Sequence, residues 1–561
     1  QFCYVLAAEA HLRLENAPMA REMCRKSMDI FKRQLIFKTS LLNTNERVKI
    51  INNDNYGLDE SLCTLLSLEN VTPEFSKQIF EFAVFLKNYA FHTYERLQQK
   101  VNNSENTDVQ KLYADWLKKR EEYYGSIRFD SSTTDPNKRA LRNDMLSMED
   151  ELYFRTGITS NAKDFSEEQF GKIQEVLEPT ELAIEFIRFR NVLTRGFMYG
   201  AFVISPGNDV PEFISICKEG ALDELLQREP LESELKYIRR IYLDNKIYNL
   251  LWLKLRENYP GAKKVYSSLS GRLHSINHEA LKIDKDKCFG DGIDLILVNS
   301  TRDIADVKMN SQDLTSAQYL AFGGIQYDFV TAGQETRDGQ SAIYQEHRGQ
   351  IPGNWKYLPN TKKEVDGIAK ILSKADGQTV LYKGLEATEM SFKQAISHTS
   401  PDIIHIATHG FYIKPEENEN FSLGSYSYTH SGLVMAGANT CFDHETSYTQ
   451  FGDGILTAPE IAMYDLSDTK LVVLSACESG LGANSSLGTS YGLQRAFKIA
   501  GAHKVVYSLW KVSDETTREF MTMFYGQLAT GVEIDLAFHN TQQLMREKYD
   551  VFNWAAFQLI H

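Results

Sequence analysis

The chain has 561 residues, of which 42% are hydrophobic and 24% charged, with seven cysteines and a formal net charge of −14. This length predicts three or four folded units, and the composition excludes a disordered, collagen-like or disulfide-stapled chain. The negative charge disfavours general binding to nucleic acid or to an anionic membrane surface. Cysteines that are so sparse and odd in number favour a reducing compartment.

The N-terminal sequence has the character of an internal helix. It begins at Gln1 without an initiator Met and lacks the basic segment of a signal peptide, so we interpret it as the start of a fragment. No window of the chain approaches the run of uncharged apolar residues that a membrane span needs. We therefore expect a cytoplasmic protein with no membrane partner.

Residues 1–177 are predicted to be helical, because segments such as Phe75–Leu97 place apolar residues three or four apart between charged ones. The opening stretch has small residues at positions that suit a tetratricopeptide repeat: Ala7, Ala8, Ala20, Cys24 and Ser27. The pattern does not recur one period later. A repeat-like helical region and an irregular helical array are equally open from the sequence.

A change of pattern near Pro179 predicts strands. The segment 182–189 alternates like a strand, and 197–205 follows as the second strand of an antiparallel hairpin. Residues 231–257 return to helical spacing, and 265–269 and 293–298 are again typical of strands.

From about residue 316, short apolar strands alternate with amphipathic stretches. The predicted strands are 319–325, 379–382, 403–407, 471–476, 504–509 and 555–560. Such alternation indicates a mostly parallel α/β sheet flanked by helices on both faces. In sheets of this kind, ligands and catalytic groups gather beyond the carboxyl ends of the strands.

Two of these strands end in residues that can react. The segment 403–408 leads into His409 and Gly410, and 471–476 leads into Cys477. If the two strands are parallel neighbours, His409 and Cys477 emerge side by side. A nearby histidine raises the thiolate fraction of a cysteine, and the N–H groups of Gly410 and Cys477 would form an oxyanion hole. The arrangement predicts acyl transfer by a His-Cys dyad, most economically peptide-bond hydrolysis.

A structural role is the alternative for each residue, because a single His or Cys at a strand end more often packs than reacts. His405 lies on the same strand face as His409 and is interpreted as a core or supporting histidine. The six other cysteines are interpreted as packing residues.

Four segments in this order, HIATHGFY, LVVLSACESGLGA, GAHKVVYSLWKVSDETT and WAAFQLI, resemble the CHAT family of caspase-like cysteine peptidases. These are typically bacterial proteins in which the peptidase follows tetratricopeptide-type helices. The resemblance implies a TPR-like region at 1–177, a non-catalytic caspase-like half at 178–315 and a catalytic half at 316–561. It also implies that His409 is the general base or acid and Cys477 the nucleophile.

The segment Trp510-Lys511-Val512-Ser513-Asp514 is similar to one in separases, distant relatives with an arginine preference. A carboxylate there can pair with a guanidinium, so Asp514 is the candidate floor of the S1 pocket and predicts a basic P1 residue. The alternative is that Asp514 is the N-cap of a helix beginning at Glu515.

Two long loops, 326–354 and 411–431, flank the expected site, and self-cleavage after Arg337 or Arg348 is a hypothesis for the first. Metal-ligand spacings and a phosphate-binding loop are absent from the sequence, and the dyad chemistry needs no cofactor.

The resemblance implies a cysteine endopeptidase that cleaves a specific protein and stays latent until a protein partner binds the N-terminal helical region. The setting that it implies is a bacterial defence or signalling system, without direct binding to nucleic acid. Two alternatives remain from the sequence: a caspase-like scaffold that only binds, and an acyltransferase or other thiol enzyme.

Overall fold

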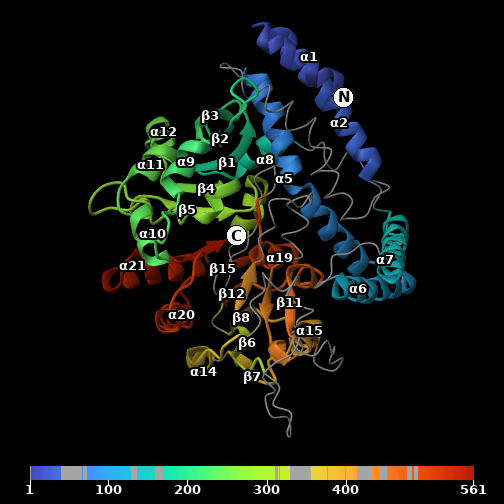
Figure 1. The fold of residues 1–561 in the computed structure, drawn as a ribbon, viewed down its shortest axis with the longest axis vertical. Coiled ribbons are helices and arrows are strands. Elements are labelled where there is room, and N and C mark those ends of the chain that lie inside the picture. The colour runs from blue at the N-terminus through green and yellow to red at the C-terminus, as the bar shows by residue number, and fades with distance from the viewer. Residues whose placement is uncertain are drawn as a thin grey trace.

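The apolar strands predicted from the sequence assemble into one large twisted sheet that crosses most of the molecule (Figure 1). The computed structural model describes residues 2–39, 66, 72–127, 135–157, 168–309, 314, 316–328, 355–375, 377–398, 400–412, 431–440, 452–476, 483–484 and 490–561. Within these residues the sheet has 11 strands in the order β3-β2-β1-β4-β5-β16-β15-β12-β8-β6-β7.

The first part of the sheet contains β1 (Glu181–Arg190), β2 (Phe197–Ile204), β3 (Glu212–Lys218), β4 (Lys264–Ser268) and β5 (Asp294–Val298). The predicted hairpin is confirmed, because β1 and β2 pair antiparallel, whereas β1, β4 and β5 run parallel. Strand β3 was not expected from the sequence; it pairs antiparallel with β2 at the edge of the sheet. Its apolar residues come in two adjacent pairs, Phe213-Ile214 and Ile216-Cys217, so the strand lacks the apolar–polar alternation that predicts a strand.

The second part contains β6 (Gln318–Ile325), β7 (Gln378–Gly384), β8 (Ile403–Thr408), β12 (Leu471–Ala476), β15 (Lys504–Ser508) and β16 (Phe557–Ile560). The predicted parallel pairing is confirmed for β15, β12, β8, β6 and β7. Strand β16 pairs antiparallel with β15 and parallel with β5, and so joins the two parts into one sheet. The predicted boundary at residues 315 and 316 falls between strands of this continuous sheet and stays a prediction.

Small sheets lie beside the large one. Strands β9 (Gly410–Tyr412), β10 (Ser431–Val434) and β11 (Ile455–Thr457) form one, and β13 (Ala483–Asn484) pairs with β14 (Ser490–Tyr491). Strand β9 begins two residues after β8 ends, so this small sheet adjoins the carboxyl end of β8.

The N-terminal region is helical, as predicted. Its helices are α1 (Phe2–Arg13), α2 (Ala17–Thr39), α5 (Pro73–Asn102), α6 (Thr107–Ile127), α7 (Pro136–Arg155) and α8 (Gln169–Val176). Helices α1 and α2 form a hairpin in which Ala8, Ala20, Cys24 and Ser27 are fully buried, as expected for a TPR-like pair. None of the described helices combines the length and hydrophobicity that crossing a membrane requires.

Helices cover both faces of the sheet. The first part carries α9 (Glu219–Leu226), α10 (Glu234–Ile241), α11 (Lys246–Leu251), α12 (Leu253–Asn258) and α13 (Ile304–Met309). The second carries α14 (Pro359–Leu372), α15 (Glu389–His398), α18 (Ala458–Ile461), α19 (Leu493–Ile499), α20 (Asp514–Leu528), α21 (Ile534–Lys548) and α22 (Val551–Trp554). The helical segment expected at 231–257 is three short helices, because turns interrupt it at 242–245 and 252.

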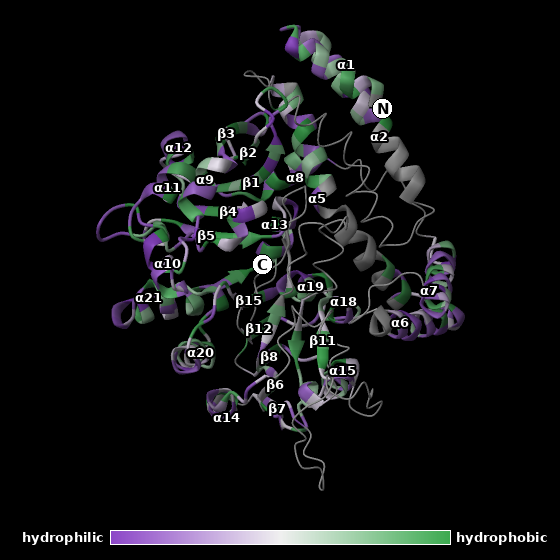
Figure 2. Cartoon of the chain, viewed as in Figure 1, coloured by the Kyte–Doolittle hydropathy of each residue, from purple (hydrophilic) through white to green (hydrophobic). Residues whose placement is uncertain are grey.

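Alternate residues of a central strand enter different cores. Ile184 and Phe186 of β1 belong to the core under α11 and α12, whereas Ala183 belongs to a core that it shares with α1, α2, α5 and α8. In Figure 2 the strands are mainly green and the outer helices mix purple with green, as expected for a sheet buried on both faces. The helical region therefore packs as part of the fold around β1.

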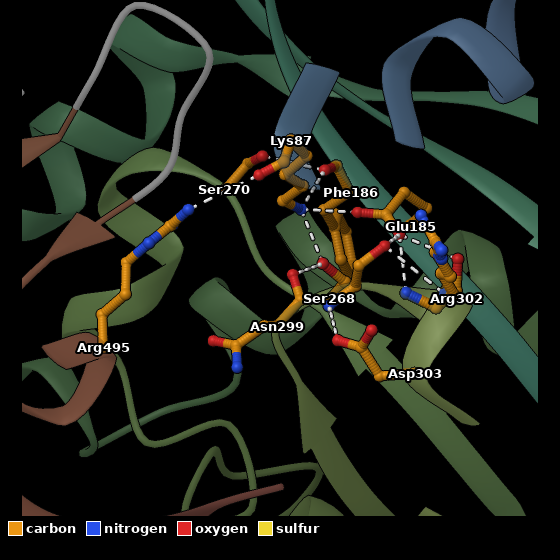
Figure 3. A network of polar contacts seen from close by, with 11 residues as sticks. Lys87, Glu185, Phe186, Ser268, Ser270, Asn299, Arg302, Asp303 and Arg495 are labelled. Carbon is orange, nitrogen blue, oxygen red and sulfur yellow. Dashed lines mark hydrogen bonds and ion pairs between the residues drawn. The ribbon is translucent and has the colours of Figure 1, made fainter. Parts of the chain in front are cut away.

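A buried polar network joins α5 to strands β1 and β4 of the sheet and to helix α19 (Figure 3). The Lys87 ammonium donates to Glu185 Oε1 at 2.6 Å and to Ser268 Oγ at 2.6 Å. The second oxygen of Glu185 accepts from the Thr301 N–H at 2.9 Å. From α19, Arg495 donates to the main-chain carbonyl of Lys87 at 3.4 Å. Burial lowers the pKa of Lys87, and the Glu185 carboxylate opposes that shift.

Loss of the Lys87 charge is expected to destabilise the protein strongly. Lys87→Met leaves the Glu185 carboxylate, which is fully buried, without its cation, at a cost of about 3 kcal/mol in the free energy of unfolding. Urea denaturation followed by tryptophan fluorescence measures this loss. The matched control is Lys77→Met in the same helix, because Lys77 pairs with Glu168 at the surface and its removal costs less than about 1 kcal/mol. Equal losses for the two variants would contradict a structural role for the network.

Candidate active site

The register of β8 and β12 places the two candidate strand ends together. The strands are parallel neighbours, and Thr408, the last residue of β8, pairs with Ala476, the last residue of β12. His409 follows Thr408 at this edge. Cys477 follows Ala476 in the sequence and lies outside the described residues. The condition stated for the dyad, that the strands be parallel neighbours, is therefore met.

The His409 ring is held from two sides. Its Nε2 lies 2.8 Å from the main-chain carbonyl oxygen of Lys356, which can only accept, so Nε2 carries a proton and the lone pair is on Nδ1. The ring of Tyr327 lies 5.2 Å from the His409 ring, centroid to centroid. Tyr327 is itself fixed, because its hydroxyl lies 3.0 Å from Thr408 Oγ1. His409 thus has a defined tautomer and orientation.

Burial lowers the pKa of His409 below its usual value. The Lys356 carbonyl and the Asp514 carboxylate oppose this shift, whereas the Lys511 ammonium adds to it. At neutral pH the imidazole is therefore mostly uncharged, and an uncharged imidazole can take a proton from a thiol.

The main-chain N–H of Gly410 is not used in the pairing of β9 with β10. Gly410 of β9 pairs with Leu433 of β10, and the Val434 N–H donates to the His409 carbonyl at 2.9 Å. In an antiparallel ladder this bond makes Gly410 and Leu433 a non-hydrogen-bonded pair, so the Gly410 N–H points away from β10.

Asp514 lies beside this edge, in the first turn of α20. The helix N-cap is Ser513, whose Oγ accepts from the Thr516 N–H at 3.3 Å, so the alternative that Asp514 caps the helix is wrong by one residue. Burial raises the pKa of Asp514, and the Glu364 carboxylate raises it further, while His409 and Lys511 oppose the shift.

A pocket opens at the carboxyl ends of β8, β12 and β15, between α14 and α20. Its lining residues are Leu358, Thr361, Glu364, Thr408, Ser475, Ala476, Ser508, Val512, Asp514, Thr517 and Phe557. Asp514 and the strand ends that precede His409 and Cys477 therefore border the same hollow.

His405 is a supporting residue, as predicted. It is fully buried, its Nε2 is hydrogen-bonded to Glu364 Oε1 at 2.8 Å, and its Nδ1 lies 3.0 Å from the Tyr525 hydroxyl. The sequence analysis did not single out Glu364 or the Lys356 carbonyl. Glu364 resembles any charged residue of an amphipathic helix, and a main-chain carbonyl has no signature in the sequence.

The other cysteines that the structure describes divide by exposure, whereas Cys63 and Cys441, also interpreted as packing residues, lie outside the described residues. Cys24, Cys217 and Cys288 are buried, and burial raises the pKa of each thiol, to about 12 for Cys24 and Cys217. Cys3 is exposed, so its interpretation as a packing residue is wrong. Arg337, Arg348 and most of the two long loops lie outside the described residues. Among the described residues, no group of three His, Cys, Asp or Glu side chains is arranged to hold a metal ion.

Comparison with known proteins finds a family match that begins at residue 243, within the first part of the sheet, and runs to the last residue. The family model described as CHAT domain matches residues 243–561, more than half of the sequence. Tetratricopeptide repeat protein 28 of Mus musculus is 25% identical over 220 residues, and that of Homo sapiens 24%. These alignments cover 37% of this chain but only 9% and 8% of the two relatives.

Two solved structures are similar at low scores. The Saccharomyces cerevisiae separase–securin complex gives a TM-score of 0.40 at 9% identity, covering 100% of this chain and 49% of that one. The Arg-specific cysteine proteinase gingipain R gives a TM-score of 0.31 at 11% identity, covering 55% and 65%. Likeness at these scores carries no weight for function.

Removing the Asp514 charge is expected to stabilise the protein at neutral pH. Because its folded pKa is raised, ionisation of Asp514 costs stability as pH rises above the unfolded value of about 3.8. Asp514→Asn should raise the melting temperature by about 1–2 °C at pH 7, with no gain near pH 3.5. Scanning calorimetry at the two pH values measures this, and Glu515→Gln, an exposed neighbour in the same turn, is the control. A lower melting temperature at pH 7 would contradict the shift.

Proposed function

Because the chain belongs to the CHAT domain family, we propose that it is a cysteine endopeptidase with Cys477 as nucleophile and His409 as its base. The observation that supports this most is the pairing of Thr408 with Ala476 at the ends of neighbouring parallel strands. The defined tautomer of His409 supports it further, since a free lone pair at Nδ1 is what a base requires.

The proposed reaction begins when His409 Nδ1 takes the proton of the Cys477 thiol. The thiolate attacks the scissile carbonyl, and the N–H groups of Gly410 and Cys477 donate to the oxyanion. His409 then gives the proton to the leaving amine, and an acyl-enzyme remains. Water, deprotonated by His409, hydrolyses the thioester and restores the thiol.

Asp514 is proposed as the residue that selects a basic P1 side chain. It lines the pocket next to Thr408 and Ala476, and its carboxylate is half-buried, where a guanidinium or ammonium pairs more strongly than in water. The substrate in this proposal is a specific protein cleaved after Arg or Lys.

Activation by a protein partner bound to the helical region is the remaining part of the proposal, with a bacterial defence or signalling system in the cytoplasm as the setting. Two contacts support coupling between that region and the site. Arg495 of α19 donates to Lys87 of α5, and Ile499 of α19 packs against the core of α5, α6 and α7. Helix α19 follows the segment that contains Cys477, so a partner that shifts α5 has a direct route to that segment.

Thiol alkylation tests the dyad without knowledge of the substrate. In the full chain at pH 7, iodoacetamide is expected to label Cys477 about tenfold faster than the exposed Cys3, because His409 raises its thiolate fraction. His409→Ala should remove that difference. His503→Ala, which removes another half-buried imidazole hydrogen-bonded to a carbonyl, should leave it unchanged. Peptide mapping by mass spectrometry gives both rates, and equal rates for Cys477 and Cys3 in the unmodified chain would contradict the proposal.

Cleavage of a proteome-derived peptide library tests specificity. New termini after Arg and Lys are expected, and they should disappear in Cys477→Ala and fall at least about tenfold in Asp514→Asn. Preference for Leu or Asp at P1 would contradict the role given to Asp514. If Cys477→Ala keeps all biological activity of the protein, proteolysis is not its function.

A further inference from the structure

Two polar groups of the pocket have no part in the chemistry proposed above. Glu364 lies in the second turn of α14, and Ser475 is the next-to-last residue of β12. Together with Asp514 from α20, they bring three oxygen-bearing side chains into one hollow from three separate elements.

Glu364 is a buried carboxylate with an unused oxygen. Its side chain is 1% exposed, and its hydrogen bond to His405 engages Oε1 only. The other ring nitrogen of His405 lies 3.0 Å from the Tyr525 hydroxyl. Among the described residues, no Lys or Arg side chain forms an ion pair with Glu364, and its hydrogen bond to His405 leaves Oε2 without a partner.

Ser475 is a buried hydroxyl without a partner. Its side-chain oxygen forms no hydrogen bond in the described part of the chain, although the residue is only 7% exposed. Ser475 pairs with Ala407 and alternates with Val473, which pairs with His405, so it shares the sheet face of His405 and Glu364. A hydroxyl buried in this way costs free energy unless a ligand supplies its hydrogen bond.

The residues that line the pocket include two carboxylates, Glu364 and Asp514, and no Lys or Arg. The Glu364 carboxylate acts on Asp514 as a like charge. The cation of this chain that acts on Asp514, Lys511, is exposed and forms no ion pair among the described residues. Two carboxylates and an unpartnered hydroxyl require a positively charged group that carries several N–H donors.

Part of the remaining lining of the pocket is apolar. Leu358, Val512 and Phe557 give the pocket apolar walls, which can contact the methylene stem of an arginine or lysine. The strand ends before His409 and Cys477 border the same pocket, so a stem that enters it leaves its own main chain at the proposed dyad.

We infer that Glu364 and Ser475, together with Asp514, bind the cationic end of the P1 side chain, and that Glu364 is a specificity-determining residue of the site. The identification of the bound group as a P1 side chain rests on the proposed function, but the binding of a cation does not depend on Cys477. The free oxygen of Glu364 and the Ser475 hydroxyl accept hydrogen bonds from the cation. The Asp514 carboxylate pairs with the cation from the α20 side.

Binding of small side-chain mimics to the full chain tests the inference. The probes are n-butylguanidine for arginine, n-pentylamine for lysine and n-butylurea as the uncharged isostere. In the Cys477→Ala protein, at least one cation should bind at least about tenfold more tightly than n-butylurea, because charge-assisted hydrogen bonds are lost in the isostere. Saturation-transfer NMR titrations give the affinities, and comparison of the two cations distinguishes arginine from lysine.

Substitutions of the lining residues test which side chains provide that affinity. Glu364→Gln, which keeps the volume and an oxygen for His405, should weaken cation binding at least about fivefold, and Ser475→Ala about threefold. Glu515→Gln, in the same turn as Asp514 but outside the pocket, should have no effect. A circular dichroism melt confirms folding, and Glu364→Asp serves if Glu364→Gln does not fold.

Three results would overturn the inference: equal affinity for the cations and n-butylurea, unchanged cation affinity in both Glu364 variants, or unchanged affinity in Ser475→Ala. The proposed peptidase function fails by a different result, equal alkylation of Cys477 and Cys3. A protein that binds the cations through Glu364 but lacks the reactive thiol would keep the pocket and lose the peptidase.

Discussion

The pairing register between β8 and β12 is the constraint on which the candidate site depends. With Thr408 opposite Ala476, the residues that follow the two strands start from the same edge of the sheet. A shift of one residue would turn alternate side chains to the other face, separating His405 from Glu364 and Ser475 from the pocket. The strands that fix the register are fully buried, so the apolar cores on both faces enforce it.

Burial shifts the pKa values of His409 and Asp514 in opposite directions, but the consequence is the same for both groups. It lowers the pKa of the imidazole and raises that of the carboxylic acid, so each group is pushed toward its uncharged form. For His409 the uncharged form is the one that accepts a proton. For Asp514 a bound cation would reverse the shift, so the stability lost on ionisation is recovered when the proposed substrate side chain arrives.

Buried polar groups hold the helical region against the sheet, and their separation costs free energy. Lys87 and Glu185 are buried together, and Arg495 of helix α19 reaches the same helix α5 (Figure 3). Strand β16 makes the corresponding link within the sheet, because it pairs with β5 on one side and β15 on the other. Movement of α5 relative to β1 therefore strains the Lys87–Glu185 ion pair, and movement relative to α19 strains the Arg495 hydrogen bond, which makes this junction a physical route for the proposed control by a partner.

The sequence by itself determined much of the local structure and supplied the candidate reactive residues. Apolar runs predicted the buried strands, helical spacing predicted the N-terminal region, and the order of motifs identified the CHAT family and His409. These features depend on neighbours within a few residues, which periodicity and motif spacing record. That signal is absent from β3, whose apolar residues do not alternate with polar ones, and it does not mark the turns that interrupt the helices at 231–257.

Only the tertiary structure decided which distant groups complete the site. The Lys356 carbonyl reaches His409 across 53 residues, and Glu364 and Ser475 meet Asp514 because α14, β12 and α20 converge at one sheet edge. The antiparallel pairing of β16 with β15, and its parallel pairing with β5, likewise had no local signature. Such contacts depend on how cores pack between elements far apart in the chain, and a single sequence records the residues but not their partners.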